Sequence, residues 1–116
     1  MSMEVSLQHV DGRPVCERCV VARSSLQKMR GLLGRSGLEE GEGLLLERAS
    51  SIHTAFMRFP IDAVFLDSDR VVMKVAADVR PWRASMRLRA RAVLELPAGE
   101  AARRGLSPGT ALRAAT

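Results

Sequence analysis

The chain of 116 residues has the length of one ordinary domain, 1–116, and it can bury a core without disulfides or metals. Its 18 basic and 13 acidic residues leave a formal charge of +5, and no apolar run reaches the ~20 residues of a membrane-spanning helix. The sequence shows no secretion signal and only two cysteines, too few for a disulfide framework, so we expect a cytoplasmic protein that does not enter a membrane.

The first third of the chain predicts a hairpin followed by a helix. Residues 4–10 and 14–22 are strand-like and flank an Asp-Gly turn at 11–13. The apolar spacing then becomes helical in "SSLQKMRGLLGR", where Ser24 and Gln27 form a capping box and a glycine marks the end. We therefore expect a short helix over residues 24–34.

The rest of the chain predicts strands that follow one another with little helix between them. A second short helix is expected over 99–104. Residues 86–96 alternate in polarity, which places Arg87, Arg89 and Arg91 on one face of a strand. The other expected strands are 43–47, 52–59, 61–67, 71–79 and 110–114. About seven or eight strands and two short helices, without strand–helix alternation, indicate a mainly β (α+β) domain with an antiparallel sheet system.

Three polar side chains interrupt the most hydrophobic stretch, "IHTAFMRFPIDAVFLD" at 52–67. In one interpretation Asp62 accepts backbone N–H bonds and pins a bend at Phe59–Pro60. In the other, the bend brings His53 and Arg58 toward Asp62, and the three groups form the polar floor of a small pocket. The two interpretations are compatible, and both depend on how the chain turns at the proline.

The densest basic region is "RPWRASMRLRAR" at 80–91, which contains five arginines and the only tryptophan, Trp82. These arginines could form a solvated strand face that pairs with nearby acids. Alternatively, arginine and an aromatic ring together could grip single-stranded nucleic acid by charge and stacking. We favour the first interpretation, because one aromatic residue is few for a stacking surface. Trp82 could also fold over the pocket as an apolar lid.

Motifs for metal binding and catalysis are weak in this chain. In "CERC" the thiols of Cys16 and Cys19 lie three positions apart in an expected strand and would point to opposite faces, which argues against redox or chelate geometry unless the strand bends. A zinc set drawn from these two, His9 and His53 lacks a second paired motif. A triad containing His53 and Asp62 lacks a nucleophile elbow. We expect neither a metal nor a cofactor.

Five segments resemble, in their order and spacing, the widespread prokaryotic family called domain of unknown function 192. They are "RGLLGR" at 30–35, "GLLL" at 43–46, "IHTAFMRFPIDAVFLD" at 52–67, "VLELPAG" at 93–99 and "RGLSPGTAL" at 104–112. The resemblance covers about residues 20–113 and implies a compact, mainly antiparallel β domain, either a sandwich or a partly open barrel with small helices. It implies no established activity. Many relatives have a "WMKNT"-like segment where this chain has "HTAFMRF".

These observations favour a non-catalytic module that binds a small molecule or a protein through a small polar-floored pocket. The expected ligand-binding residues are His53, Met57, Arg58, Asp62, Trp82 and Arg83. One alternative is a hydrolase or transferase that uses His53 and Asp62 as an acid–base pair. Another is a protein that binds single-stranded nucleic acid through the arginines of 80–91. We expect a monomer or a weak homodimer.

Overall fold

A hairpin begins the fold, as the Asp-Gly turn predicted. The computed structural model describes residues 3–23 and 35–115, and in it β1 (Met3–His9) pairs antiparallel with β2 (Pro14–Ala22). Gly12 in the turn has a φ of 97°, a left-handed conformation that favours glycine. The helix expected over 24–34 lies outside the described residues.

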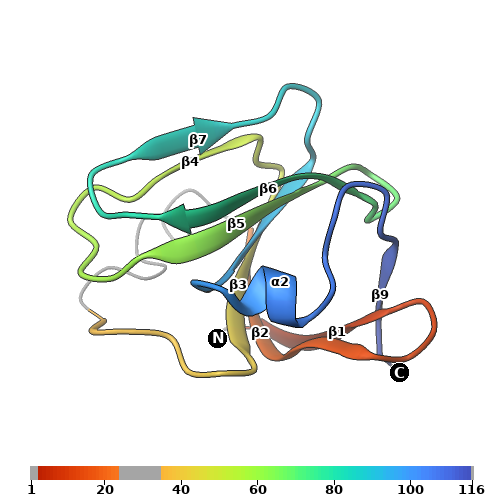
Figure 1. Ribbon diagram of the computed structural model, residues 1–116. Coiled ribbons are helices and arrows are strands. Elements are labelled where there is room, and N and C mark those ends of the chain that lie inside the picture. The colour runs from red at the N-terminus through yellow and green to blue at the C-terminus, as the bar shows by residue number, and fades with distance from the viewer. Residues whose placement is uncertain (1–2, 24–34, 116) are drawn as a thin grey trace.

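Seven strands form one curled sheet in the order β6-β5-β8-β3-β2-β1-β9 (Figure 1). Those not yet introduced are β3 (Glu42–Glu47), β5 (Ile61–Leu66), β6 (Val72–Val79), β8 (Ala92–Pro97) and β9 (Leu112–Ala114). Neighbours are antiparallel except β2 and β3, which run parallel and are joined by the long connection that a parallel pair requires. A bridge between Val71 and Ala111 links the two ends of the sheet, and Val72 N donates to Thr110 O at 2.8 Å. The sheet is therefore a partly closed barrel.

The curled sheet carries a hydrophobic cluster on each face. All seven strands contribute to the inner cluster, as does α2 (Glu100–Arg103), so this cluster is the interior of the barrel. Within β5 the side chains alternate as a strand requires: Val64 and Leu66 belong to the inner cluster, and Ala63 and Phe65 to the outer one. The other main members of the outer cluster are Ala22, Leu44, Leu46, Ile52, Met57, Ile61, Ala90 and Val93.

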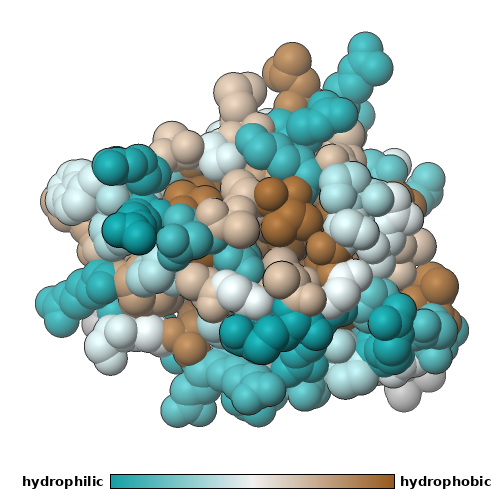
Figure 2. Space-filling view, in the orientation of Figure 1, coloured by the Kyte–Doolittle hydropathy of each residue, from teal (hydrophilic) through white to brown (hydrophobic). Residues whose placement is uncertain are grey.

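A small second sheet covers part of the outer cluster. Its strands β4 (Ser51–His53) and β7 (Ala84–Met86) pair antiparallel, and Figure 1 shows them side by side, next to β6. Ile52 points from β4 into the outer cluster. Figure 2, in the orientation of Figure 1, shows apolar residues gathered in the middle of the side toward the viewer and hydrophilic residues around them. The second sheet thus gives the domain a short extra layer beside the edge strand β6.

Two expected strands are wrong in extent. Of the expected 52–59 only 52–53 is strand, as the end of β4, and the chain turns from Thr54 onward. The expected strand over 86–96 divides into β7 and β8, with a turn between them in which Ala90 N donates to Arg87 O and Arg89 has a φ of 69°. The chain passes there from the small sheet to the large one, and the period of a segment cannot show which sheet each half joins. The predicted arginine stripe therefore does not form.

The C-terminal part agrees with the sequence prediction. Helix α2 lies within the expected 99–104, and Gly105 follows it with a φ of 72°. It is the one helix in the described part of the chain, where no helix is long and apolar enough to cross a membrane.

Candidate functional site

A shallow hollow of about 560 Å³ lies where β4 and β7 meet the edge strand β6. It is lined by Ser51, Ile52, His53, Lys74, Ala84, Ser85 and Met86. The register of the small sheet brings these groups together, because His53 lies opposite Ala84 and Ser51 opposite Met86. A few polar groups in a largely apolar lining are typical of a small-ligand site.

Lys74 supplies the positive charge of this hollow. Its Nζ donates to Ser85 Oγ at 3.1 Å and to the Met86 carbonyl oxygen at 2.9 Å, and it lies 5.4 Å from the centroid of the Phe65 ring. An ammonium group has three donors, so the two bonds to β7 leave one N–H. The lining contains no acidic residue, and residues 3–23 and 35–115 give Lys74 no ion-pair partner. The hollow therefore offers a cation of fixed position to an anionic group.

His53 lines this hollow as well, alone among the six residues that the sequence singled out. It is the last residue of β4, and its side chain is exposed while the preceding Ile52 is buried. Its imidazole can donate or accept a hydrogen bond. No pattern in the sequence marked Lys74, Ser85 and Met86, because their approach to His53 depends on the contacts of β6 and β7 with β4, which are a tertiary property.

Asp62 does not join His53. The carboxylate is buried, Oδ1 accepts from Asp78 N at 2.9 Å, and Oδ2 accepts from Gly99 N at 3.0 Å and Ala101 N at 2.9 Å. Asp62 thus pins backbone, as one interpretation held, but at the end of β6 and at the start of α2 instead of at the proline bend. The acid–base pair of the enzyme alternative does not form, because backbone amides occupy both carboxylate oxygens.

Thr54 fastens two turns together beside the hollow. Its fully buried hydroxyl donates to Arg80 O at 2.6 Å and accepts from Arg83 N at 2.9 Å. Its backbone N donates to Arg83 O at 2.8 Å, and Trp82 N donates to Thr54 O at 3.1 Å. These four bonds hold two turns next to each other, one containing Trp82 and the other containing Phe56.

Phe56 and Trp82 form an exposed aromatic pair at the tips of these turns. Their ring centroids are 4.7 Å apart with an interplanar angle of 60°, and the residues are 70% and 61% exposed. Both have left-handed backbones, with φ of 65° and 64°. Such conformations cost a non-glycine residue on the order of 1 kcal/mol or more. Trp82 is therefore not an apolar lid over the hollow but one half of an outward-facing pair.

The remaining predicted site residues lie around this pair or beneath it. Met57 is buried in the outer cluster and does not line the hollow. Arg58 and Arg83 are exposed, and Arg83 Nη1 donates to the Trp82 carbonyl oxygen at 3.3 Å. The structure thus separates the predicted site into three places: the hollow with His53, the aromatic turns, and the buried carboxylate of Asp62.

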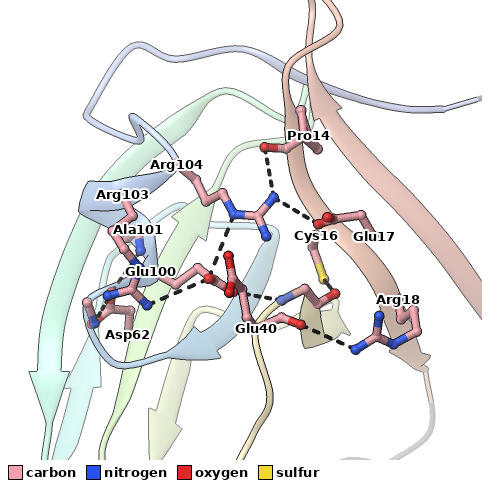
Figure 3. A network of polar contacts seen from close by, with 12 residues as sticks. Pro14, Cys16, Glu17, Arg18, Glu40, Asp62, Glu100, Ala101, Arg103 and Arg104 are labelled. Carbon is pink, nitrogen blue, oxygen red and sulfur yellow. Dashed lines mark hydrogen bonds and ion pairs between the residues drawn. The ribbon is translucent and has the colours of Figure 1, made fainter.

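Figure 3 shows a network of polar contacts around α2. Glu100 is fully buried, and its Oε2 accepts from Gly41 N at 3.1 Å. Its Oε1 lies 3.6 Å from Arg103 Nη2 and 3.7 Å from Arg104 Nε, while Arg104 Nη1 reaches Glu17 Oε1 at 2.8 Å. The network ties α2 to β2 and the loop before β3, so its role is structural.

The alternation expected over 86–96 puts Glu95 on the exposed face of the strand with Arg87, Arg89 and Arg91, and this is wrong. It is buried in β8 opposite Leu44 and Ala63, which belong to the outer cluster, and residues 3–23 and 35–115 give it no ion pair. Burial raises the pKa of Glu95 to about 7. The expectation failed because it relied on the arginine stripe, which the break at 87–91 removes.

Cys16 and Cys19 both face the inner cluster, contrary to the strand-based expectation. Cys19 pairs with Val5 and Cys16 with Leu7, so β2 has one more residue than β1 over this interval, and the bulge turns both thiols inward. A hydrogen bond with the Cys16 thiol and burial raise the pKa of Cys19. Among the described residues no three His, Cys, Asp or Glu side chains are arranged to hold a metal ion. His9 instead contacts Arg104 O through Nε2 at 2.6 Å.

Comparison with known proteins gives one family and two similar structures. The DUF192 family model, described as "Uncharacterized ACR", matches residues 7–114. A crystal structure of a protein of unknown function from Novosphingobium aromaticivorans is 30% identical with a TM-score of 0.83, and the alignment covers 97% of this chain and 84% of that one. A structure called a putative transcription regulator, from Sinorhizobium meliloti, is 24% identical with a TM-score of 0.84 over 98% of this chain and 94% of that one, which shows a shared fold. Among curated proteins no match is found.

Proposed function

We propose, on the premise that this chain belongs to the DUF192 family, that it is a non-catalytic module that binds a small anionic ligand in the hollow between β4, β7 and β6. The observation that carries the proposal is the ammonium group of Lys74, which two hydrogen bonds hold at the hollow without an acid in its lining. Because the Lys74 side chain is already ordered before a ligand binds, binding an anion costs less conformational entropy.

The other lining groups support a ligand with one anionic end and a small apolar part. The imidazole of His53 and the hydroxyl groups of Ser51 and Ser85 supply hydrogen bonds to carboxylate or phosphate oxygens. Ile52 and Met86 supply apolar contact. The volume of about 560 Å³ lies within the roughly 300–1,000 Å³ of small-molecule sites.

The test is thermal unfolding of the protein with four anions that separate the two contributions. Acetate and inorganic phosphate offer only the charge, whereas butyrate and phenyl phosphate add an apolar part. We expect the larger anions to raise the melting temperature more, because a ligand that binds the folded state alone stabilises it by mass action. Comparing the two carboxylates with the two phosphates shows which anionic group the hollow binds more tightly.

Lys74→Gln tests the charge with little change in side-chain length. We expect the variant to fold and to lose the ligand-induced rise in melting temperature, whereas Arg80→Gln removes an exposed cation outside the hollow and should keep it. His53→Gln should weaken binding in part. An unchanged rise in Lys74→Gln would show that the anions bind elsewhere and would overturn the proposal.

A further inference from the structure

We infer that the Phe56–Trp82 pair is a stacking platform for single-stranded nucleic acid. The platform consists of the two turns at 54–57 and 80–83, joined by Thr54. It shares no lining residue with the hollow, so the inference stands apart from the proposed anion site.

The first support is that the pair is held exposed at a conformational cost. Both residues have positive φ, a region in which glycine would be unstrained. Both are mostly exposed, at 70% and 61%, so burial does not offset that cost. Strained backbone that the surrounding structure enforces is characteristic of functional positions. Here the buried hydroxyl of Thr54 bonds to the residues that flank Trp82, and the Thr54 carbonyl oxygen accepts from Met57 N and Trp82 N in the two turns.

The second support is the charge around the rings. Arg58 follows Phe56 by two positions, and Arg83 follows Trp82 directly. Both arginines are exposed, and within 3–23 and 35–115 neither has an ion-pair partner. Two exposed arginines that follow the two aromatic residues closely in the chain and have no ion pair in the described residues favour a polyanion over an apolar protein surface.

The geometry of the rings favours bases over the carboxylates of an acidic peptide. An edge-to-face pair uses one ring face in its own contact, and the other faces remain open for stacking. Unpaired bases expose π faces, whereas bases in a duplex are stacked on one another. Aromatic rings with adjacent arginines are the usual elements of sequence-tolerant single-strand binding.

The experiment uses the emission of Trp82, which is the only tryptophan in a chain without tyrosine. Titration with oligothymidylate should quench this emission as a base stacks on the indole. Duplex DNA of the same length and polyglutamate serve as the competing ligands. No quenching by the single strand, or equal quenching by the duplex or by polyglutamate, would overturn the inference.

Phe56→Gly removes one ring and keeps the fold, since glycine adopts a φ of 65° without strain. We expect the affinity for the oligonucleotide to fall about tenfold or more, the usual effect of losing one stacking partner. Leu88→Ala is the matched control, because Leu88 is also 70% exposed but lies outside the platform. An unchanged affinity in Phe56→Gly would show that Phe56 does not stack, which overturns the inference.

Salt dependence tests the arginines. Each phosphate contact to a single strand contributes about 0.7 to the slope of log affinity against log salt concentration. Arg58→Gln combined with Arg83→Gln should therefore reduce the slope by about 1.4 if each arginine holds one phosphate. A slope equal to that of the wild type would remove the charge argument and overturn the inference.

Discussion

Replacing Asp62 by asparagine should destabilise the domain by about 3 kcal/mol. The carboxylate accepts three backbone N–H bonds, two of them at Oδ2 from Gly99 and Ala101 and one at Oδ1 from Asp78. Asparagine has one carbonyl oxygen, so its best orientation keeps the two bonds near α2 and turns an NH₂ group toward Asp78 N. A lost hydrogen bond to a charged group costs about 1.5–3 kcal/mol, and the orphaned donor and the two weakened bonds add to this.

The measurement is urea unfolding of both proteins followed by circular dichroism, with the free energies compared at unchanged m-value. Asp69→Asn is the control, since Asp69 lies exposed in the turn before β6 and should change the stability by less than about 0.5 kcal/mol. A loss below about 1 kcal/mol for Asp62→Asn would refute the reasoning, because it would mean that the three amides do not depend on the negative charge.

Two further predictions concern buried polar groups. Because burial raises the pKa of Glu95 to about 7, the contribution of Glu95 to the free energy of unfolding should fall as the pH rises from about 4.5 to about 7, by about 3 kcal/mol in all. Glu95→Gln should lack this fall, because glutamine does not titrate. The difference in unfolding free energy between the variant and the wild type should therefore change between about pH 4 and about pH 8. An equal difference at both pH values would contradict the prediction. Thr54→Val should cost about 2 kcal/mol, because it leaves Arg83 N and Arg80 O unpaired, and should raise the mobility of Trp82 in fluorescence anisotropy. Thr110→Val is its control and should cost less than half as much, because the Thr110 hydroxyl makes only exposed contacts, with Ser107 N at 3.2 Å and Ser107 Oγ at 3.5 Å.

The candidate site could be predicted only in part, and His53 shows why. The sequence marked a polar residue at the end of an apolar strand, and it does line a hollow. Its neighbour there, Lys74, lies 21 positions away on β6, and their proximity depends on the pairing of β4 with β7 and on the contact between β7 and β6. Phe56 was missed for a related reason. The alternation that suggested a strand concealed the turn that exposes its ring.

The sequence by itself determined the local features of the fold, because local chemistry is sufficient for them. The Asp-Gly turn predicted the first hairpin, and Gly12 has the left-handed φ that the turn needs. The strands expected at 61–67 and 71–79 pair as a second hairpin, in whose turn Asp67 Oδ1 accepts from Asp69 N and Val71 N. The apolar run at 61–67 likewise predicted a strand, and the structure divides its side chains between the inner and the outer cluster.

Only the tertiary structure decided which polar groups are buried and what they contact. The partners of Asp62 are 16 to 39 positions away, and the bulge that turns both cysteines inward exists only because β2 pairs with β1. Glu95 is buried because the chain breaks at 87–91 and changes sheets, which no periodicity within that segment records. Turn residues form hydrogen bonds with backbone groups a few positions away, so their effect can be predicted locally. Burial and charge pairing depend instead on contacts between strands that are far apart in the sequence.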